Sequence, residues 1–245
     1  TDPSDLQNFY EFPVSNYSIY FDGDDDIIVI DSDLIDGTIQ GNNPFSISIS
    51  MFGNDDFSGS NGGSGIIFSK GDEPMSNEDP ASVVLEFGNG GDPSDPEQWN
   101  LTFNIYSTYN SKITKSVGID LFNPDIWNHI TITYDGGNTA DAINFYKDGV
   151  LFNQISNTYS SDDFSGAYNQ PPEPLYIGGQ PNWKPMKGAL GSFTIWNTNL
   201  DDMAIQSFLE NGMSSNETGL IGNWIFHEGY GDTIVDLSGN GNNAI

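Results

Sequence analysis

Short apolar segments separated by clusters of Gly, Asn, Asp and Pro recur along almost the whole chain. In residues 45–51 (FSISISM), apolar and polar side chains alternate strictly, which is typical of a strand with one face in a core and the other in water. Residues 143–152 (INFYKDGVLF) contain Asp148-Gly149, a pair that favours the positive φ angles of a tight hairpin turn. The pattern predicts an all-β fold in which two antiparallel sheets pack as a sandwich.

One segment departs from this pattern. Residues 201–210 (DDMAIQSFLE) begin with two aspartates, which suit the N-terminus of a helix, and carry apolar side chains at Ile205, Phe208 and Leu209. We expect this segment to be the only helix, one to three turns long.

The predicted domain organisation is simple. The chain has 245 residues, of which 36% are hydrophobic, and this is enough for one domain with a substantial core. Residues 1–13 are polar and contain two prolines, so we predict a linker or lead-in there and a single domain over residues 14–245. The linker-like opening predicts a piece of a longer protein. There is no run of about 18 apolar residues, so membrane insertion is not expected.

The charge balance is extreme, with 35 acidic residues against six lysines and a net charge of −29. Phosphate binding requires clustered cations, so a nucleic-acid ligand is not expected, and an anionic membrane surface is disfavoured for the same reason. The acids favour cations, neutral glycans or solubility in salty water, and an acidic surface that only keeps a secreted protein soluble is the alternative. Cysteine is absent, so the core must supply the stability without disulfides.

Several segments stand in an order that resembles a known family. They are residues 19–30 (IYFDGDDDIIVI), 126–137 (IWNHITITYDGG), 143–152, 175–179 (LYIGG), 188–200 (GALGSFTIWNTNL) and 219–245 (GLIGNWIFHEGYGDTIVDLSGNGNNAI). The chain resembles the laminin-G-like, concanavalin A-like jelly-roll modules of large secreted and surface proteins, which implies a jelly roll that binds more than it catalyses. In many members the last segment precedes the first. We therefore expect the C-terminal segment, with a short strand at residues 233–237, to fold back beside Phe21 and close the sheet.

The carboxylate spacing of a glycosidase is absent. Retaining glucanases on this fold carry their nucleophile and acid at alternate positions of one strand, and no strand here shows that pattern. Glu86 is the only acid in its strand, and we interpret it as a polar residue of the rim or the concave face. His129 and His227 lie in strand motifs, where neighbours can satisfy them. We predict a protein that is not an enzyme, with a glycoside hydrolase or polysaccharide lyase as a minor alternative.

The resemblance also implies a metal site. Family members often carry one calcium at the edge of the sandwich, and the aspartate of their Asp-x-Ser-Gly-Asn-Gly turn matches Asp236, whereas Gly191 stands where a second acid is usual. Calcium is accordingly the predicted cofactor, with Asp236, Asn240 and Asp25 as its first candidate ligands. The alternative is turn chemistry, in which Asp and Asn side chains bond to their own backbone.

Lectin sites on this fold stack an aromatic ring on the sugar and surround it with polar side chains. Trp183 lies between Pro181 and Pro185 in a loop (QPNWKPMK), so we expect its indole to be exposed. The predicted ligand patch consists of Trp183, Asn182, Gln180, Lys184, Tyr168 and Asn169. The alternative is a Trp183 folded over its own loop. The other tryptophans lie in strand patterns and are predicted to be core residues, namely Trp99, Trp127, Trp196 and Trp224.

These features predict a non-catalytic binding module of a larger exported protein, located outside the cell or on its surface. Its expected partner is a glycan or surface polysaccharide, in polysaccharide recognition or cell adhesion, and other domains of the same long chain are possible contacts. The alternative is a structural spacer in a giant adhesin or filament, with no ligand of its own.

Overall fold

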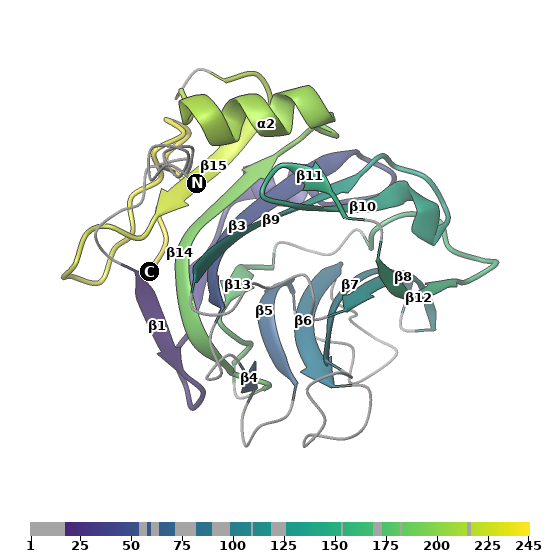
Figure 1. Cartoon of the computed structure of the whole chain (residues 1–245), viewed down its shortest axis with the longest axis horizontal. Coiled ribbons are helices and arrows are strands. Elements are labelled where there is room, and N and C mark those ends of the chain that lie inside the picture. The colour runs from purple at the N-terminus through teal and green to yellow at the C-terminus, as the bar shows by residue number, and fades with distance from the viewer. Residues whose placement is uncertain are drawn as a thin grey trace, which may run out of the picture.

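The computed structural model describes residues 18–53, 58–59, 64–71, 82–89, 99–108, 110–118, 126–152, 154–168, 173–181, 183–214 and 217–245. In these residues two antiparallel sheets face each other as a sandwich, which confirms the predicted fold class (Figure 1). The predicted lead-in, residues 1–13, lies outside them.

The described strands divide into two sheets. Sheet A contains, in order, β1 (Ile19–Asp22), β14 (Met186–Trp196), β3 (Phe45–Gly53), β9 (Ile126–Tyr134), β10 (Ile143–Lys147) and β11 (Val150–Leu151), and both β15 (Leu220–Ile225) and β4 (Ser58–Gly59) also pair with β14. Sheet B contains, in order, β12 (Ile155–Ser160), β8 (Ser111–Gly118), β7 (Trp99–Thr108), β6 (Val83–Asn89), β5 (Gly65–Lys70), β13 (Leu175–Ile177) and β2 (Ile28–Ile30).

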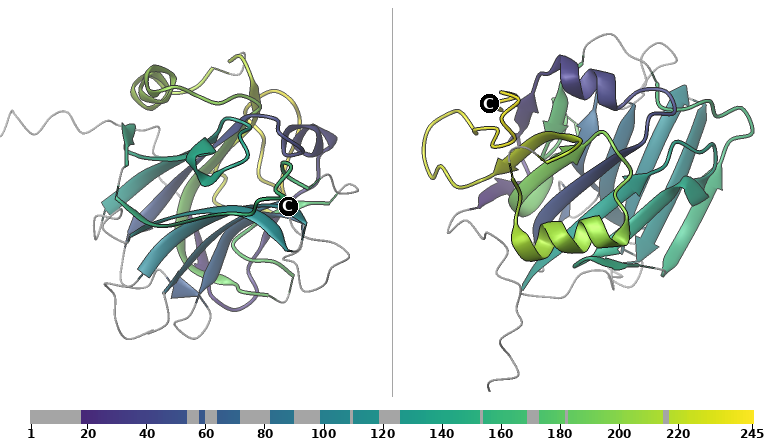
Figure 2. Two further views of the ribbon diagram at one scale, coloured as in Figure 1. Left: turned by 90° about the vertical axis from the view of Figure 1, so that its right-hand side faces the viewer. Right: turned by 90° about the horizontal axis from the view of Figure 1, so that it is seen from above.

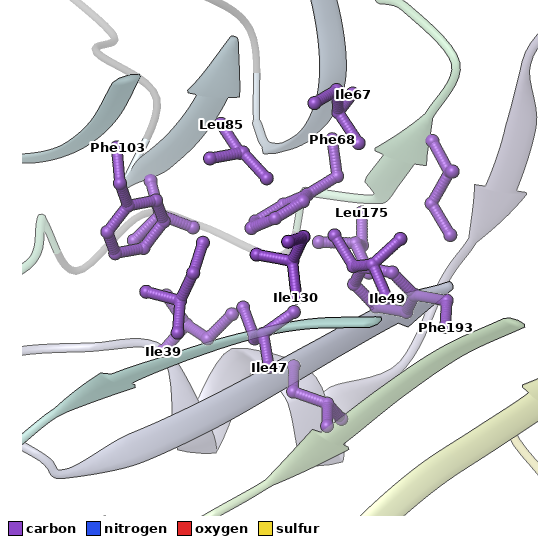
Figure 3. Packing of buried hydrophobic residues seen from close by; sticks show 14 of the residues in the cluster. Ile39, Ile47, Ile49, Ile67, Phe68, Leu85, Phe103, Ile130, Leu175 and Phe193 are labelled. Atoms are coloured by element: carbon purple, nitrogen blue, oxygen red, sulfur yellow. The ribbon is translucent and has the colours of Figure 1, made fainter. Parts of the chain in front are cut away.

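The core lies between the sheets and consists of the inward-facing apolar residues of both (Figure 3). Phe193 of sheet A packs against Phe68 of sheet B with ring centroids 5.4 Å apart, and Phe45 lies 6.3 Å from Phe103 in the same way. Fully burying one large apolar side chain contributes about 1.5–3 kcal/mol. The interdigitated rings can therefore hold the sandwich together without disulfides.

The C-terminal segment closes sheet A beside Phe21, as predicted. β1 pairs with residues 187–190 of β14 and β15 with residues 192–196, so these two strands lie end to end along one edge. Gly178 is required at this closure, because a Cβ on it would lie 2.0 Å from the Phe21 ring and its φ is +93°. The strand predicted at residues 233–237 is wrong, since this stretch forms an isolated bridge between Ile234 and Ala244 and no ladder.

Two α-helices are described, not one. α2 (Asp202–Asn211) has the predicted position, and the Asp201 carboxylate caps it by accepting from Ala204 N at 2.8 Å. The expectation of a single helix is wrong because α1 (Asp33–Thr38) forms after the cap residue Ser32, and η5 (Ala140–Ala142) adds a 3-10 turn. Six residues are too few to show a helical apolar period. None of the described helices has the length and apolar character to cross a membrane.

α2 lies across the outer face of sheet A (Figure 2). Its Phe208 ring contacts the rings of His129 and Trp196, with centroids 5.3 and 5.2 Å apart. Ser46 and Ser48, which were predicted to face water, are fully buried on this side of β3. The prediction failed because alternation shows which residues share a face, and not what covers that face.

The tryptophans divide between the core and the surface. Trp196 and Trp224 are fully buried, as predicted. Trp127 is only partly buried, so its assignment to the core is wrong: it projects from the outer face of β9, where its ring lies 5.5 Å from that of Phe52. The side chain of Trp99 lies outside the described part of the structure.

Candidate functional site

The outer face of sheet B is hollowed by an open groove of about 550 Å³. Its floor is formed by residues of β6, β7, β8 and β12, which are neighbouring strands of sheet B (Figure 1). Leu85, Phe103 and Ile113 of these strands point into the core. The alternate residues of the same strands are mostly polar and point outward into the groove. Its described lining consists of Ser64, Glu86, Gly88, Asn100, Thr102, Asn104, Lys112, Thr114, Ser116, Ser156, Asn157 and Lys184.

The strand register aligns the lining side chains in rows across the sheet. One row consists of Glu86, Thr102, Ser116 and Asn157, on β6, β7, β8 and β12. A neighbouring row consists of Asn104, Thr114 and Tyr159, on β7, β8 and β12. Because adjacent strands lie about 4.8 Å apart, each row presents a polar group at every strand that it crosses.

Hydrogen bonds fix the side chains of the floor. Thr114 Oγ1 donates to Asn104 Oδ1 at 2.7 Å, and Asn104 Nδ2 donates to Glu86 Oε1 at 3.4 Å. Lys184 Nζ donates to Glu86 Oε2 at 2.9 Å, which pairs the two charges at the end of this series. Since each of these groups is held by a neighbour, binding a ligand would immobilise few of them, which lowers its entropic cost.

A tight turn brings Lys184 to the groove. Gln180 and Trp183 exchange two backbone hydrogen bonds of 3.1 and 3.0 Å, and the carbonyl of Lys184 accepts from Ile66 N at 3.0 Å. Lys184 has a φ of 41°, an uncommon conformation for a residue with a side chain and one that clusters at functional sites. Trp183 is 37% exposed, as predicted, and its ring centroid lies 6.0 Å from the Lys184 ammonium. This turn therefore places an exposed indole next to the groove.

A second exposed aromatic ring lies outside the lining residues, on the strand that contributes Ser156 and Asn157 to the groove. Tyr159 lies on β12, the edge strand of sheet B, and is 50% exposed. Its register partner is Thr114, so both side chains rise from the same face. Tyr159 was not predicted as a site residue, because residues 155–160 (ISNTYS) show little apolar character. The alternation of Asn157 and Tyr159 was the one signal that these two share a face.

Of the described residues in the predicted ligand patch, only Lys184 lines the groove: Trp183 lies next to the lining, and Gln180 and Tyr168 lie away from it. Gln180 is buried, and its amide donates two hydrogen bonds at the end of β5, which gives it a structural role. Tyr168 lies beside the end of β7, where its backbone N–H donates to Tyr106 O at 2.6 Å. Asn169 and Asn182 lie outside the described residues.

Among its described residues the groove holds one carboxylate, that of Glu86. Most glycoside hydrolases place two carboxyl groups about 5–9.5 Å apart around the scissile bond, so this set of side chains fits binding better than that chemistry. His129 lies on the other sheet, under α2, where burial lowers its pKa to about 3. Its Nδ1 atom is 3.3 Å from Ser48 Oγ, but both residues are buried and no substrate can reach them.

Asp236 closes the C-terminal turn from a buried position. Its carboxylate accepts hydrogen bonds of 2.8–3.0 Å from the backbone N–H groups of Asn223, Ser238 and Asn242 and from the Ser238 hydroxyl. The amide of Asn240 donates to two carbonyl groups of β15 at 2.9 and 3.0 Å. Both residues therefore join the turn to β15 through hydrogen bonds, which is the turn chemistry considered above.

These contacts bear on the predicted calcium site. Calcium takes six to eight oxygen ligands, and the two oxygens of Asp236 already accept four hydrogen bonds. Asp25 is exposed in the loop between β1 and β2. The described residues contain no group of three or more His, Cys, Asp or Glu side chains that could hold a metal. Asp236 as described does not fit a calcium ligand, and calcium binding elsewhere stays a prediction.

Comparisons with known proteins bear on the whole fold. The family model of the Concanavalin A-like lectin/glucanases superfamily (Laminin_G_3) matches residues 22–206. A similar solved structure is that of a protein from Bacteroides ovatus ATCC 8483, provisionally described as carbohydrate-binding, with a TM-score of 0.57 and 17% identity, covering 93% of this chain and 58% of that chain. A comparison with curated protein sequences gives no match.

Two further solved structures are similar over most of their own length. The CBM40 of a Ruminococcus gnavus IT-sialidase has a TM-score of 0.52 and 15% identity, over 77% of this chain and 94% of that chain. A heptameric SAP-like pentraxin from Limulus polyphemus has a TM-score of 0.51 and 13% identity, over 93% of each chain. At these identities the likeness shows the fold alone.

Proposed function

Since the chain belongs to the concanavalin A-like lectin/glucanase superfamily, we propose that it is a non-catalytic carbohydrate-binding module of a larger exported protein. The groove on sheet B is the binding site, and the role is polysaccharide recognition outside the cell or at its surface. One observation carries the proposal: a polar floor held in one geometry has an exposed aromatic side chain near each side, Trp183 and Tyr159.

The chemistry of the groove suits a sugar. Thr102, Asn104 and Thr114 offer hydroxyl and amide groups that donate and accept hydrogen bonds, as the hydroxyl groups of a sugar require. Aromatic side chains offer a large apolar surface for the C–H face of a sugar ring. From β6 to β12 the floor crosses three strand spacings, roughly 14 Å, so it suits a short stretch of a polysaccharide better than a single sugar.

Two structural neighbours support this class of ligand by their names. The Bacteroides protein is provisionally described as carbohydrate-binding, and the Ruminococcus domain is the CBM40 of a sialidase. The present chain spans 58% of the first of these, which agrees with a module in a longer protein. The single described carboxylate of the groove, Glu86, is ion-paired with Lys184, and this supports binding without catalysis.

A glycan array with and without calcium tests the proposal, followed by titration of the best ligand into two tyrosine variants. Tyr159→Ala removes a ring beside the groove, and Tyr20→Ala removes an equally exposed ring (49% against 50%) from an edge strand of sheet A. Losing an aromatic contact of about 1 kcal/mol should weaken binding roughly fivefold in Tyr159→Ala and leave Tyr20→Ala unchanged. Equal losses of affinity in the two variants would show that the groove is not the binding site. An array without a single ligand would favour the spacer alternative.

A further inference from the structure

Lys112 differs from Lys184, the other lysine in the described lining of the groove, in the surroundings of its charge. Acids outnumber lysines by 35 to six, and the side chains of Lys70 and Lys184 are ion-paired with Asp36 and Glu86. Lys112 forms no ion pair with a described carboxylate. Its ammonium instead lies 5.2 Å from the centroid of the Tyr106 ring, a cation–π contact with a partner that carries no negative charge.

Lys112 lines the groove on sheet B. It lies on β8, opposite Tyr106 of β7, and it shares the outer face of β8 with Thr114 and Ser116. Side chains two residues apart on one strand stand about 6.6 Å from each other. Lys112 therefore stands next to the hydroxyl side chains of the floor, on the same face of β8.

The charge of the groove has the opposite sign to that of the chain. Its described lining holds two ammonium groups and one carboxylate, whereas the whole chain has a net charge of −29. The carboxylate of Glu86 is compensated by Lys184 at 2.9 Å, so the remaining charge is that of Lys112. Distant acids on the surface act weakly on a ligand in the groove, since salt at physiological strength screens charges over about 8 Å.

We propose that the groove recognises an anionic polysaccharide, with Lys112 contacting a carboxylate or sulfate group of the sugar. This inference rests on the proposed function and adds the class of its ligand. Thr114 and Ser116 bind neighbouring hydroxyl groups, and the Glu86–Lys184 pair bounds the groove on the side of β6.

The test is calorimetric titration with three oligosaccharide sets of equal length: oligogalacturonates, sulfated galactans, and carboxyl-reduced oligogalacturonates as the neutral control. One anionic set should bind about tenfold more tightly than the neutral set, the size expected for one charge-assisted hydrogen bond. Which anionic set binds distinguishes a carboxylate from a sulfate ligand. Lys112→Gln should remove this preference, and Lys112→Arg should largely keep it.

Lys147→Gln is the matched control, because it removes the same charge from β10 of sheet A. Equal losses in Lys112→Gln and Lys147→Gln would show an unspecific charge effect and overturn the inference. Equal binding of anionic and neutral sets, unchanged in Lys112→Gln, would overturn it too and leave the proposed function standing. Binding of no set by the wild type would count against the proposed function itself. Melting curves show that the variants are folded.

Discussion

The two outer faces of the sandwich carry similar hydroxyl side chains in different surroundings. On sheet A, Ser48 Oγ lies 2.8 Å from Thr131 Oγ1, and both residues are buried beside His129 under α2. On sheet B, the hydroxyls of Thr102 and Thr114 line an open groove. One helix makes this difference. Rows of Ser and Thr on a strand therefore indicate an outward face, and the helix decides whether that face stabilises the fold or can bind a ligand.

The largest predicted effect compares Trp196, on the outer face of sheet A, with Trp183, in the turn next to the groove of sheet B. Trp196 is fully buried under α2, so Trp196→Ala should lower the free energy of unfolding by about 3–5 kcal/mol. Trp183 is 37% exposed, and Trp183→Ala should cost less than about 1 kcal/mol while weakening glycan binding. Denaturant midpoints measure both. If Trp183→Ala lowers the midpoint as far as Trp196→Ala does, Trp183 is a structural residue and not part of the ligand patch.

A change at Asp236 tests how the edge of sheet A is closed. Asp236→Ala leaves three buried backbone N–H groups without their acceptor, which should cost about 3 kcal/mol. We expect the same loss in millimolar calcium and in EDTA, measured by thermal melting with a magnesium control. A calcium ion bound to the native state would instead stabilise the wild type by about 2.7 kcal/mol at a hundred times Kd. Such a gain, absent from the variant, would establish the calcium site that the family resemblance implies.

Local features were predictable because a few residues encode them. Asp148 and Gly149 adopt φ angles of 48° and 79° in the expected turn, and Asp201 caps α2. Which of the two outer faces is covered by a helix and which stays open was not predictable in this way. α2 is positioned by Phe208 against His129 and by other contacts to strands far away in the sequence, and a short window of residues contains no such information.

The candidate site was predicted only in part, because some of its features are encoded by neighbouring residues and others depend on distant contacts. The flanking prolines correctly indicated an exposed Trp183 next to Lys184. Gln180 was placed in the patch because it is polar and lies in the same loop, but acceptors at the end of β5 draw its amide inward. The contribution of β12, with Tyr159, depends on pairing between strands and became visible only in the fold.

The burial of His129 under α2 can be tested by measuring stability as a function of pH. Burial lowers the pKa of His129 from about 6.5 to about 3, so the unfolded chain binds one proton more than the folded chain between these values. This contribution to the free energy of unfolding is present well above pH 6.5 and is lost as the pH falls, with a slope that approaches about 1.4 kcal/mol per pH unit. His129→Asn removes this contribution, so between pH 6.5 and 5.5 the wild type should lose about 1 kcal/mol more than the variant in urea titrations. Parallel losses would show that water reaches His129.

The smallest effect is expected at Glu86. This prediction tests whether the groove on sheet B only binds a glycan or also cleaves it. Glu86 and Lys184 are 23% and 26% exposed, and ion pairs of such exposure contribute less than about 1 kcal/mol. Glu86→Gln keeps an oxygen that can accept from Lys184, so stability should change by less than that. Neither protein should turn over β-glucans, alginate or ulvan. Sustained turnover by the wild type that disappears in Glu86→Gln would make the groove an active site. Absence of turnover in both, with glycan binding retained, would leave Glu86 the role of holding Lys184 in place.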